Sequence, residues 1–336
     1  MGKKQSIEDL AEQYYATSNV SSRELIDEYL DNSTHLAGKS VDQYRSALRI
    51  FLAYINKFCD NRHVTEMKPL DFMKYQNWLV KQGLFSSAIR IKRSAVSNLN
   101  SHIILYHGEE FPTFRNYVTQ AIKIPETGKK NEKIPITDEE YARLCNYLEE
   151  KESWQKLAYV KFSYITGCRR NETRQLLKEV VTYSPIEKMV KVRDKDGIEA
   201  IVPMKKYRTN LITCKGKASN ADRIRRLSFD EDTLFYLKKL LEVRGDDECV
   251  YMFAIKTGKN ITQVSESCFN EWCKEFSDFL GRRIHPHLFR SSRASSLALQ
   301  GKNLEAIRDL LGHKSVETTK IYIVKDDEDG EDELFT

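Results

Sequence analysis

Apolar residues in the first third of the chain recur at three- and four-residue steps, which is the pattern of amphipathic helices. The longest run follows Ser40, whose spacing to Gln43 predicts a capping box at the start of a helix that ends near Phe58. Helices are predicted over residues 22–29, 40–58, 69–83 and 87–106. Four such helices predict a compact helical domain over residues 21–121, preceded by an N-terminal extension of residues 1–20.

A change of pattern separates this domain from a second one. Residues 122–136 are polar and contain Pro125, Gly128 and Pro135, which predicts a linker. Further helices are predicted over residues 138–148, 154–164, 170–178, 231–243, 265–280, 286–300 and 304–311. Short β-like runs are predicted over residues 189–192, 200–204, 210–213 and 224–229. The predicted fold is therefore mainly α with a small antiparallel sheet, and the second domain is expected to cover residues 137–325.

The charge of the chain favours a polyanionic partner. Its 336 residues include 54 basic and 49 acidic side chains, a formal charge of +5. Seven of the acids lie in the tail of residues 326–336, which has no basic residue, so the rest of the chain has 54 bases against 42 acids, or +12. This excess suits nucleic acid, although charge alone fits a merely soluble basic protein equally well.

Cysteine usage and hydropathy restrict the compartment. The seven cysteines are scattered without a C-x-x-C pair, which argues against a disulfide framework or a zinc module and favours a reducing environment. No apolar run reaches the roughly 18 to 20 residues that span a bilayer, and the N-terminal segment lacks the apolar core of a signal peptide. The sequence therefore predicts a cytoplasmic protein with no membrane partner.

Five short elements in the second domain carry the candidate chemistry. In chain order they are Thr166-Gly167-Cys168-Arg169 with Glu172, Lys215-Gly216, His287-x-x-Arg290, Leu311-Gly312-His313 and Tyr322. No single element identifies the site, because short motifs recur by chance and each of these residues could have a purely structural role. Together, their order and spacing resemble the tyrosine recombinase (phage integrase) family. The resemblance covers the whole second domain, which would be the catalytic domain, and the helical first half is similar to that family's SAM-like core-binding domain.

The resemblance implies a site-specific recombinase that exchanges DNA strands through a covalent intermediate. Tyr322 would attack a DNA phosphodiester, leave a 3′-phosphotyrosyl bond and release a 5′-hydroxyl that can attack a partner strand. The covalent link conserves the bond energy, so neither ATP nor a cofactor is expected. A tyrosine hydroxyl has a pKa of about 10, so it needs cationic helpers and a route for its proton.

The resemblance also implies a role for each residue that would assist Tyr322. Arg169 and Arg290 would be two guanidinium forks on the phosphate, a geometry that lysine does not match. His313 would be a further donor to the phosphate, and His287 would assist proton transfer near the tyrosine oxygen. Glu172 would hold neighbouring groups in place.

The lysine of the site has several candidates. Lys215, in the Lys-Gly turn, would protonate the leaving 5′ oxygen, while Lys217, Lys205 and Lys206 lie close to it in the sequence. These alternatives arise because the segment of residues 179–213, which precedes the Lys-Gly element, is longer than in compact members of the family. Its length suggests that a strand or hairpin has been inserted. A second departure is Ser291, which stands where relatives commonly have a histidine.

Cations near the start of the helix over residues 87–106 are candidate DNA contacts. Arg90, Lys92 and Arg93 lie beside several serines, a combination that suits phosphate binding. The alternative is an ordinary solvated helix face. Lys217 is a further expected DNA contact.

The expected assembly is a homotetramer on two double-stranded DNA recombination sites, with an accessory DNA-bending protein as a further partner. Integration or excision of a mobile element is the favoured role, because of the inserted segment. Xer-like resolution of chromosome dimers, a type IB topoisomerase-like enzyme and a catalytically silent architectural protein are the alternatives. No metal is expected, since His285, His287 and His313 have no acidic or cysteine partner at ligand spacing.

The acidic tail is expected to have one of two roles. It would dock on a neighbouring protomer through Leu334 and Phe335 and time cleavage, or it would be a disordered solubilising segment.

Overall fold

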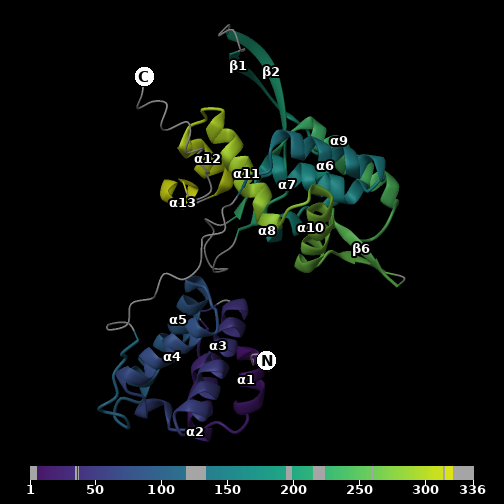
Figure 1. The fold of residues 1–336 in the computed structure, drawn as a ribbon. Coiled ribbons are helices and arrows are strands. Elements are labelled where there is room, and N and C mark those ends of the chain that lie inside the picture. The colour runs from purple at the N-terminus through teal and green to yellow at the C-terminus, as the bar shows by residue number, and fades with distance from the viewer. Residues whose placement is uncertain are drawn as a thin grey trace. The chain divides into compact units, whose positions relative to one another are not determined.

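The chain divides into two compact units, residues 1–131 and 132–336 (Figure 1). Each unit has its own hydrophobic core. The computed structural model describes residues 6–34, 36, 38–118, 134–193, 199–214, 224–258, 260–312 and 315–320. Within these residues the secondary structure is mostly helical, with three small antiparallel sheets, as the sequence predicts.

The first unit is a group of helices. They are α1 (Ile7–Tyr14), α2 (Val20–Asp31), α3 (Gly38–Phe58), the 3-10 turn η1 (Val64–Glu66), α4 (Pro69–Lys81) and α5 (Ser86–Tyr106). The capping box predicted at Ser40 is wrong, because α3 begins two residues earlier and Ser40 lies inside its first turn. Helix α1 falls in the predicted N-terminal extension, where Leu10 packs against Ile50 and Ala53 of α3.

Phe51 of α3 lies at the centre of the first core. Its ring is 4.9 Å from that of Tyr75 and 5.9 Å from that of Phe72, both on α4. Leu99 and Ile103 of α5 are fully buried in the same cluster. Three helices thus converge on one aromatic group, which is what the periodic apolar positions require.

The second unit contains the remaining helices. They are α6 (Asp138–Glu150), α7 (Trp154–Thr166), α8 (Arg170–Arg174), the 3-10 turn η2 (Lys178–Thr182), α9 (Glu231–Arg244), α10 (Glu266–Leu280), α11 (Pro286–Leu299), α12 (Leu304–Leu311) and α13 (Val316–Lys320). Helix α8 is shorter than predicted because the segment after it pairs with another part of the chain. Met252 N donates to Leu176 O at 2.8 Å, and Lys178 N donates to Val250 O at 2.9 Å.

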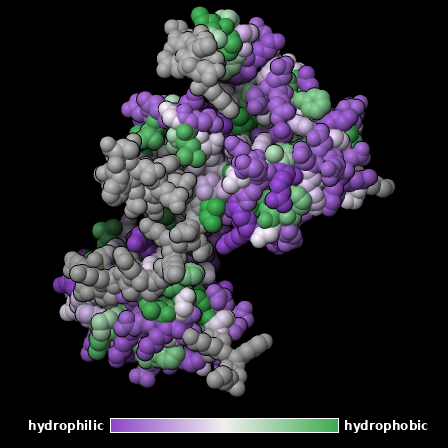
Figure 2. Space-filling model, turned by 45° about the horizontal axis from the view of Figure 1, so that its top comes forward, coloured by the Kyte–Doolittle hydropathy of each residue, from purple (hydrophilic) through white to green (hydrophobic). Residues whose placement is uncertain are grey.

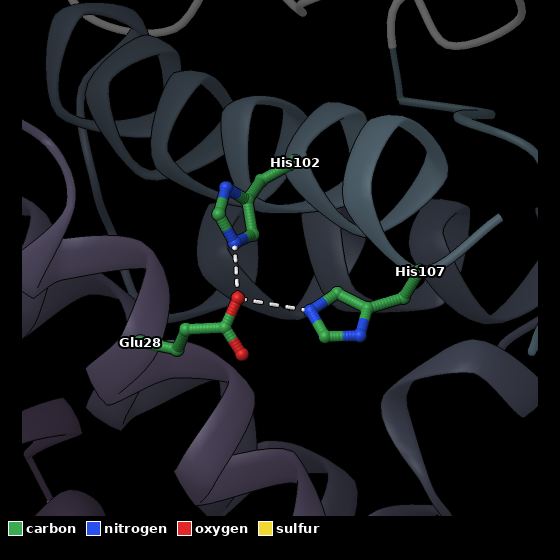
Figure 3. A group of neighbouring side chains, drawn as sticks. All are labelled: Glu28, His102 and His107. Atoms are coloured by element: carbon green, nitrogen blue, oxygen red, sulfur yellow. Dashed lines mark hydrogen bonds and ion pairs between the residues drawn. The ribbon is translucent and has the colours of Figure 1, made fainter.

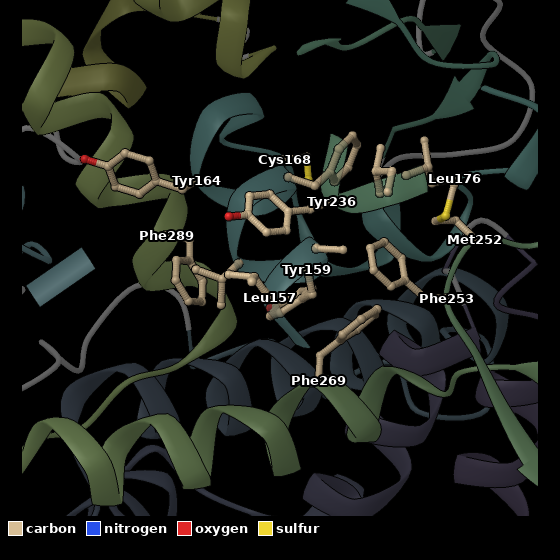
Figure 4. Packing of buried hydrophobic residues seen from close by; sticks show 14 of the residues in the cluster. Leu157, Tyr159, Tyr164, Cys168, Leu176, Tyr236, Met252, Phe253, Phe269 and Phe289 are labelled. Atoms are coloured by element: carbon tan, nitrogen blue, oxygen red, sulfur yellow. The ribbon is translucent and has the colours of Figure 1, made fainter. Parts of the chain in front are cut away.

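Helix α7 runs through the middle of the second core (Figure 4). Tyr159 stacks on Phe269 of α10 with ring centres 4.6 Å apart. It also meets Phe253 and Phe289 edge-on, at 6.2 and 5.8 Å. Aromatic packing on several sides fixes α7 in place, and the end of α7 is where the candidate site begins.

The strands form three separate sheets. They are β1 (Ile186–Arg193), β2 (Glu199–Arg208), β3 (Ile212–Thr213), β4 (Ile224–Arg225), β5 (Ser228–Phe229), β6 (Ala254–Thr257) and β7 (Asn260–Gln263). Strands β1 and β2 form a long hairpin, and the end of β2 pairs with β5; β3 pairs with β4, and β6 with β7. Figure 1 shows the β1–β2 hairpin projecting from the body of its unit, in the segment that the sequence marks as longer than usual. The β6–β7 hairpin is not predicted, because its four-residue strands have little apolar alternation.

The described surface is largely polar. Figure 2 shows hydrophilic side chains over most of the visible face, interrupted by separate hydrophobic patches. No helix among the described residues is both long and apolar enough to cross a bilayer.

Candidate active site

The Thr-Gly-x-Arg element forms the sharp junction between α7 and α8. Thr166 donates its hydroxyl to Phe162 O at 2.6 Å, and Gly167 ends α7 in the left-handed conformation, with φ +57°. A Cβ on residue 167 would lie 2.7 Å from a methyl carbon of Leu311, so the glycine also allows the end of α12 to approach. The turn directs the chain into α8 with Arg169 as its first flanking residue.

Glu172 joins two guanidinium groups beneath this junction. Its Oε1 accepts from Arg169 Nη1 at 2.8 Å, and its Oε2 accepts from Arg169 N at 3.0 Å and from Arg225 Nη2 at 2.9 Å. The Glu172 side chain is only 2% exposed, whereas those of Arg169 and Arg225 are 27% and 18% exposed. Arg169 is therefore held by a buried carboxylate while part of its surface stays accessible.

The Glu172 carboxyl remains charged despite its burial. Burial alone raises its pKa, but the charge of Arg225 and the hydrogen bonds from Arg169 and Arg225 outweigh this effect and lower the pKa below its ordinary value. A permanent negative charge at this point offsets part of the positive charge of the two arginines. The sequence-based expectation that Glu172 supports its neighbours is consistent with these contacts.

Arg290 lies fully buried on α11 and ties three segments together. Its Nη1 donates to Gly167 O at 2.7 Å, and its Nη2 donates to Leu311 O at 2.6 Å. The guanidinium thus connects the α7–α8 junction with the last turn of α12. A cation beside the unpaired carbonyls of a helix C-terminus is electrostatically favourable.

The same helix end receives a second arginine. Arg225 Nη1 donates to Leu310 O at 2.7 Å, while its Nη2 holds Glu172. Gly312 follows with φ +65°, and a Cβ there would lie 2.7 Å from Arg225 Nη1. The turn that leads to His313 is therefore packed directly against Arg225.

Arg225 is the residue of this cluster that sequence reasoning missed. It lies 53 positions from Glu172 and 85 from Leu310. Its signal in the sequence is its place on the strand that follows the Lys215-Gly216 element, since β4 pairs with β3, which precedes that element. The cluster can orient cationic groups at one point, which is the requirement for binding a phosphate.

His287 lies in the first turn of α11, one helical turn before Arg290, and is half-buried. The neighbouring Ser291 is buried and donates to the carbonyls of His287 and Leu288, at 3.2 and 3.1 Å. The Ser291 hydroxyl is therefore bonded to the backbone of its own helix, in keeping with a structural role.

Several predicted site residues lie outside the described residues: Lys215, Lys217, His313 and Tyr322. Two alternative lysines, Lys205 and Lys206, lie on β2 of the projecting hairpin, and Lys205 Nζ is 3.5 Å from a carboxylate oxygen of Glu187. The structure thus brings together Arg169, Glu172 and Arg290, with Arg225 added.

The expected DNA contacts on α5 differ in their surroundings. Arg90 is exposed, whereas burial lowers the pKa values of the half-buried Lys92 and Arg93. Arg93 donates to Gln76 Oε1 and to Val118 O, both at 2.5 Å. In this structure Arg93 therefore links α4 with the chain beyond α5, and Arg90 is the cation that faces solvent.

Comparison with known proteins identifies the family of the chain. Residues 135–329 match the profile of the phage integrase family. The chain is 29% identical over 320 residues to the SPbeta prophage-derived recombinase-like protein YomM of Bacillus subtilis, covering 93% of this chain and 90% of that protein. It is 26% identical over 309 residues to the tyrosine recombinase XerC of Rickettsia bellii, covering 88% of each.

Solved structures show the same fold. The Tn1549 transposon integrase in complex with transposon right-end DNA matches with a TM-score of 0.65 at 13% identity, covering 92% of this chain and 96% of that one. The XerH recombinase bound to palindromic difH matches with a TM-score of 0.63 at 18% identity, covering 98% and 93%. The family match spans more than half of the chain, so this chain belongs to the phage integrase family. It is a tyrosine-type site-specific recombinase.

Proposed function

We propose that the chain cleaves and rejoins DNA at specific sites through Tyr322. The tyrosine oxygen attacks the phosphorus of a phosphodiester, a 3′-phosphotyrosyl bond forms, and the bond to the 5′ oxygen breaks. The 5′-hydroxyl of a partner strand then reverses the step. The observation that carries the proposal is the cluster in which Glu172 and two helix ends hold Arg169, Arg225 and Arg290 in one place.

The arginines would stabilise the charge that develops on the non-bridging oxygens. Arg169 is the accessible fork, and its partner Glu172 fixes its direction. Arg290 is fully buried and donates to the end of α12, so it would reach a phosphate only if that helix end moved. His313 would add a donor, and His287 would help to move the tyrosine proton.

Lys215 would supply the proton to the leaving 5′ oxygen. The support is positional: β3 and β4 flank residues 215–223, and Arg225 on β4 is bonded to Glu172 and to α12. The same strand pair that carries the lysine is thus linked to the arginine cluster. Lys205 and Lys206 belong to the β1–β2 hairpin instead.

The substrate would be double-stranded DNA bound by a homotetramer, with an accessory DNA-bending protein as a further partner. Arg90, Lys92, Arg93 and Lys217 remain candidate DNA contacts, of which Arg90 is the exposed one on α5. The prophage-derived relative favours integration or excision of a mobile element. The XerC relatives keep chromosome-dimer resolution as the second candidate.

Trapping the covalent intermediate tests the chemistry. A duplex that carries a recombination site and is nicked next to the cleavage point should give a protein–DNA adduct that survives denaturing electrophoresis. Tyr322→Phe should abolish the adduct because it removes the attacking oxygen. Tyr183→Phe is a matched control, since that hydroxyl bonds to Glu179 on η2. Adduct formation by Tyr322→Phe would refute the proposal.

A second readout separates exchange from relaxation. Two differently labelled sites should give recombinant products with the wild-type chain, whereas a topoisomerase-like enzyme rejoins only the original strands. An adduct without recombinant products would refute the proposal of strand exchange but would still support covalent cleavage by the chain.

A further inference from the structure

A cluster of three side chains in the first unit lies apart from the arginine cluster described above. His102 Nε2 is 3.1 Å from Glu28 Oε1, and His107 Nε2 is 2.9 Å from the same oxygen (Figure 3). The three atoms all lie within 4.8 Å of one another. Glu28 comes from α2, His102 from α5 and His107 from the residue that ends α5.

We propose that Glu28, His102 and His107 bind one zinc ion. Zinc takes imidazole nitrogen and carboxylate oxygen at about 2.0 to 2.2 Å in a tetrahedral arrangement, which places neighbouring ligand atoms about 3.3 Å apart. The two nitrogen–oxygen distances of 2.9 and 3.1 Å need to lengthen by only a few tenths of an ångström to reach this spacing. The rings converge on one carboxylate oxygen rather than each taking a different one.

The surroundings hold the ligands in a suitable orientation. The His102 side chain is 10% exposed, and its ring lies 5.4 Å from that of Tyr29 and 4.8 Å from that of Tyr106. His107 Nδ1 is 3.9 Å from Glu110 Oε2, so the carboxylate stands beside the ring nitrogen that does not face the metal position. This distance is too long for a hydrogen bond, but a rotation of the Glu110 side chain would bring it within reach of Nδ1. A ligating histidine commonly donates its second ring nitrogen to such a carboxylate, which fixes the ring and makes it a better ligand.

The site has an open side. The Glu28 side chain is 40% exposed, so an ion can enter from solvent and a water can complete the coordination. Two imidazoles and a carboxylate match zinc rather than calcium or magnesium, which prefer oxygen ligands throughout. An ion here would join α2 to the C-terminal end of α5 in the core-binding half of the chain.

The competing explanation is a hydrogen-bonded network in which both imidazoles donate to the carboxylate. Adding zinc chloride to the full chain after dialysis against a chelator distinguishes the two. We expect one ion per chain by titration calorimetry and a melting temperature that rises with zinc concentration, because only the folded state has the site. Cobalt(II) should give the visible absorption of a four-coordinate centre, a readout independent of recombination.

Substitutions assign the ion to this cluster. Glu28→Gln and His102→Gln should each weaken zinc binding by about 100-fold, and Glu110→Gln by about tenfold. Glu24→Gln, an exposed acid one turn earlier on α2, is the matched control and should bind as wild type does. Far-ultraviolet circular dichroism verifies that the variants fold, and the partly exposed Glu28 is the position that best tolerates change. Absence of stoichiometric binding by the wild type, or unaltered binding by Glu28→Gln, would overturn the proposal.

Discussion

One buried carboxylate organises the charged residues of the candidate active site. Glu172 receives three hydrogen bonds, two from Arg169 and one from Arg225. A buried guanidinium or carboxylate without its partner is costly, so each member of the set depends on the others. The geometry of these arginines is therefore a property of the set rather than of any single residue.

Replacing this carboxylate by its neutral isostere should disturb cleavage and stability together. Glu172→Gln keeps the shape but removes the charge that orients Arg169, so covalent-adduct formation should slow by about tenfold or more. The free energy of unfolding should fall by about 1 to 3 kcal/mol at neutral pH. Because folding lowers the pKa of Glu172, its contribution is complete above the unfolded pKa and is lost as the pH falls through the folded pKa. The stability difference between the wild type and the variant should shrink on acidification below about pH 4.5, and a constant difference in urea unfolding would contradict this explanation.

Two helices end at the site with glycines in the left-handed conformation, and both ends are crowded. The space beside Gly167 is filled by Leu311, and the space beside Gly312 is filled by Arg225. By contrast, Gly281 ends α10 with φ +71° and has open space around the position of a Cβ. This difference separates the effect of backbone conformation from that of close packing.

Alanine at the two kinds of helix end should therefore have different consequences. Gly281→Ala should lower the free energy of unfolding by about 1 to 2 kcal/mol, the cost of the left-handed conformation. Gly312→Ala should cost more, because the new methyl group displaces Arg225, and it should also slow adduct formation. Denaturant unfolding and the nicked-duplex reaction measure the two effects. Equal losses in the two variants, with cleavage unchanged, would show that the contact with Arg225 is unimportant.

Helices whose apolar residues recur at regular steps could be predicted from the sequence. Element ends that depend on hydrogen bonds to a distant segment could not. The helices over residues 69–83 and 286–300 are predicted to within two residues of α4 and α11. The predicted end of α8 is wrong because Leu176 pairs with Met252, far along the chain. In the site, the three-residue spacing of Arg169 and Glu172 is visible in the sequence, but the contacts of Arg225 depend on tertiary packing.

The same limit applies to the histidine cluster of the first unit. No metal is expected from the sequence, in which only His285, His287 and His313 are candidates for a metal site. His102 and His107 have two acids next to them on their own segment, Glu109 and Glu110. Glu110 Oε2 lies 3.9 Å from Nδ1 of His107, not beside the Nε2 atom that contacts Glu28. Glu28 lies 74 positions before His102. Only the packing of α2 against α5 brings these residues together.

At the scale of the whole molecule, the two units have separate cores, and the chain as a whole has a net positive charge. The acids of residues 326–336 offset more than half of the excess carried by the rest of the chain, which is +12 without them and +5 with them. Binding to DNA should release counterions in proportion to the phosphates that are neutralised.

Affinity for DNA should therefore fall steeply with salt. For six phosphate contacts, the loss between about 50 and about 200 mM salt is about a thousandfold. Deletion of residues 326–336 should raise affinity at low salt, because it removes seven negative charges, and the gain should disappear at high salt. Fluorescence anisotropy with a labelled duplex measures both effects. A flat salt response would count against the DNA-binding surface, and equal affinities for the two forms at low salt would show that the tail does not compete with DNA.

The last turn of α12 is held by two arginines of the candidate active site. Leu310 and Leu311 are consecutive residues of one turn, and their carbonyls engage Arg225 and Arg290 respectively. We therefore expect a displacement of this turn to affect both arginines at once and, through Arg225, to affect Glu172. The two guanidinium groups should lose or regain their contacts with α12 together.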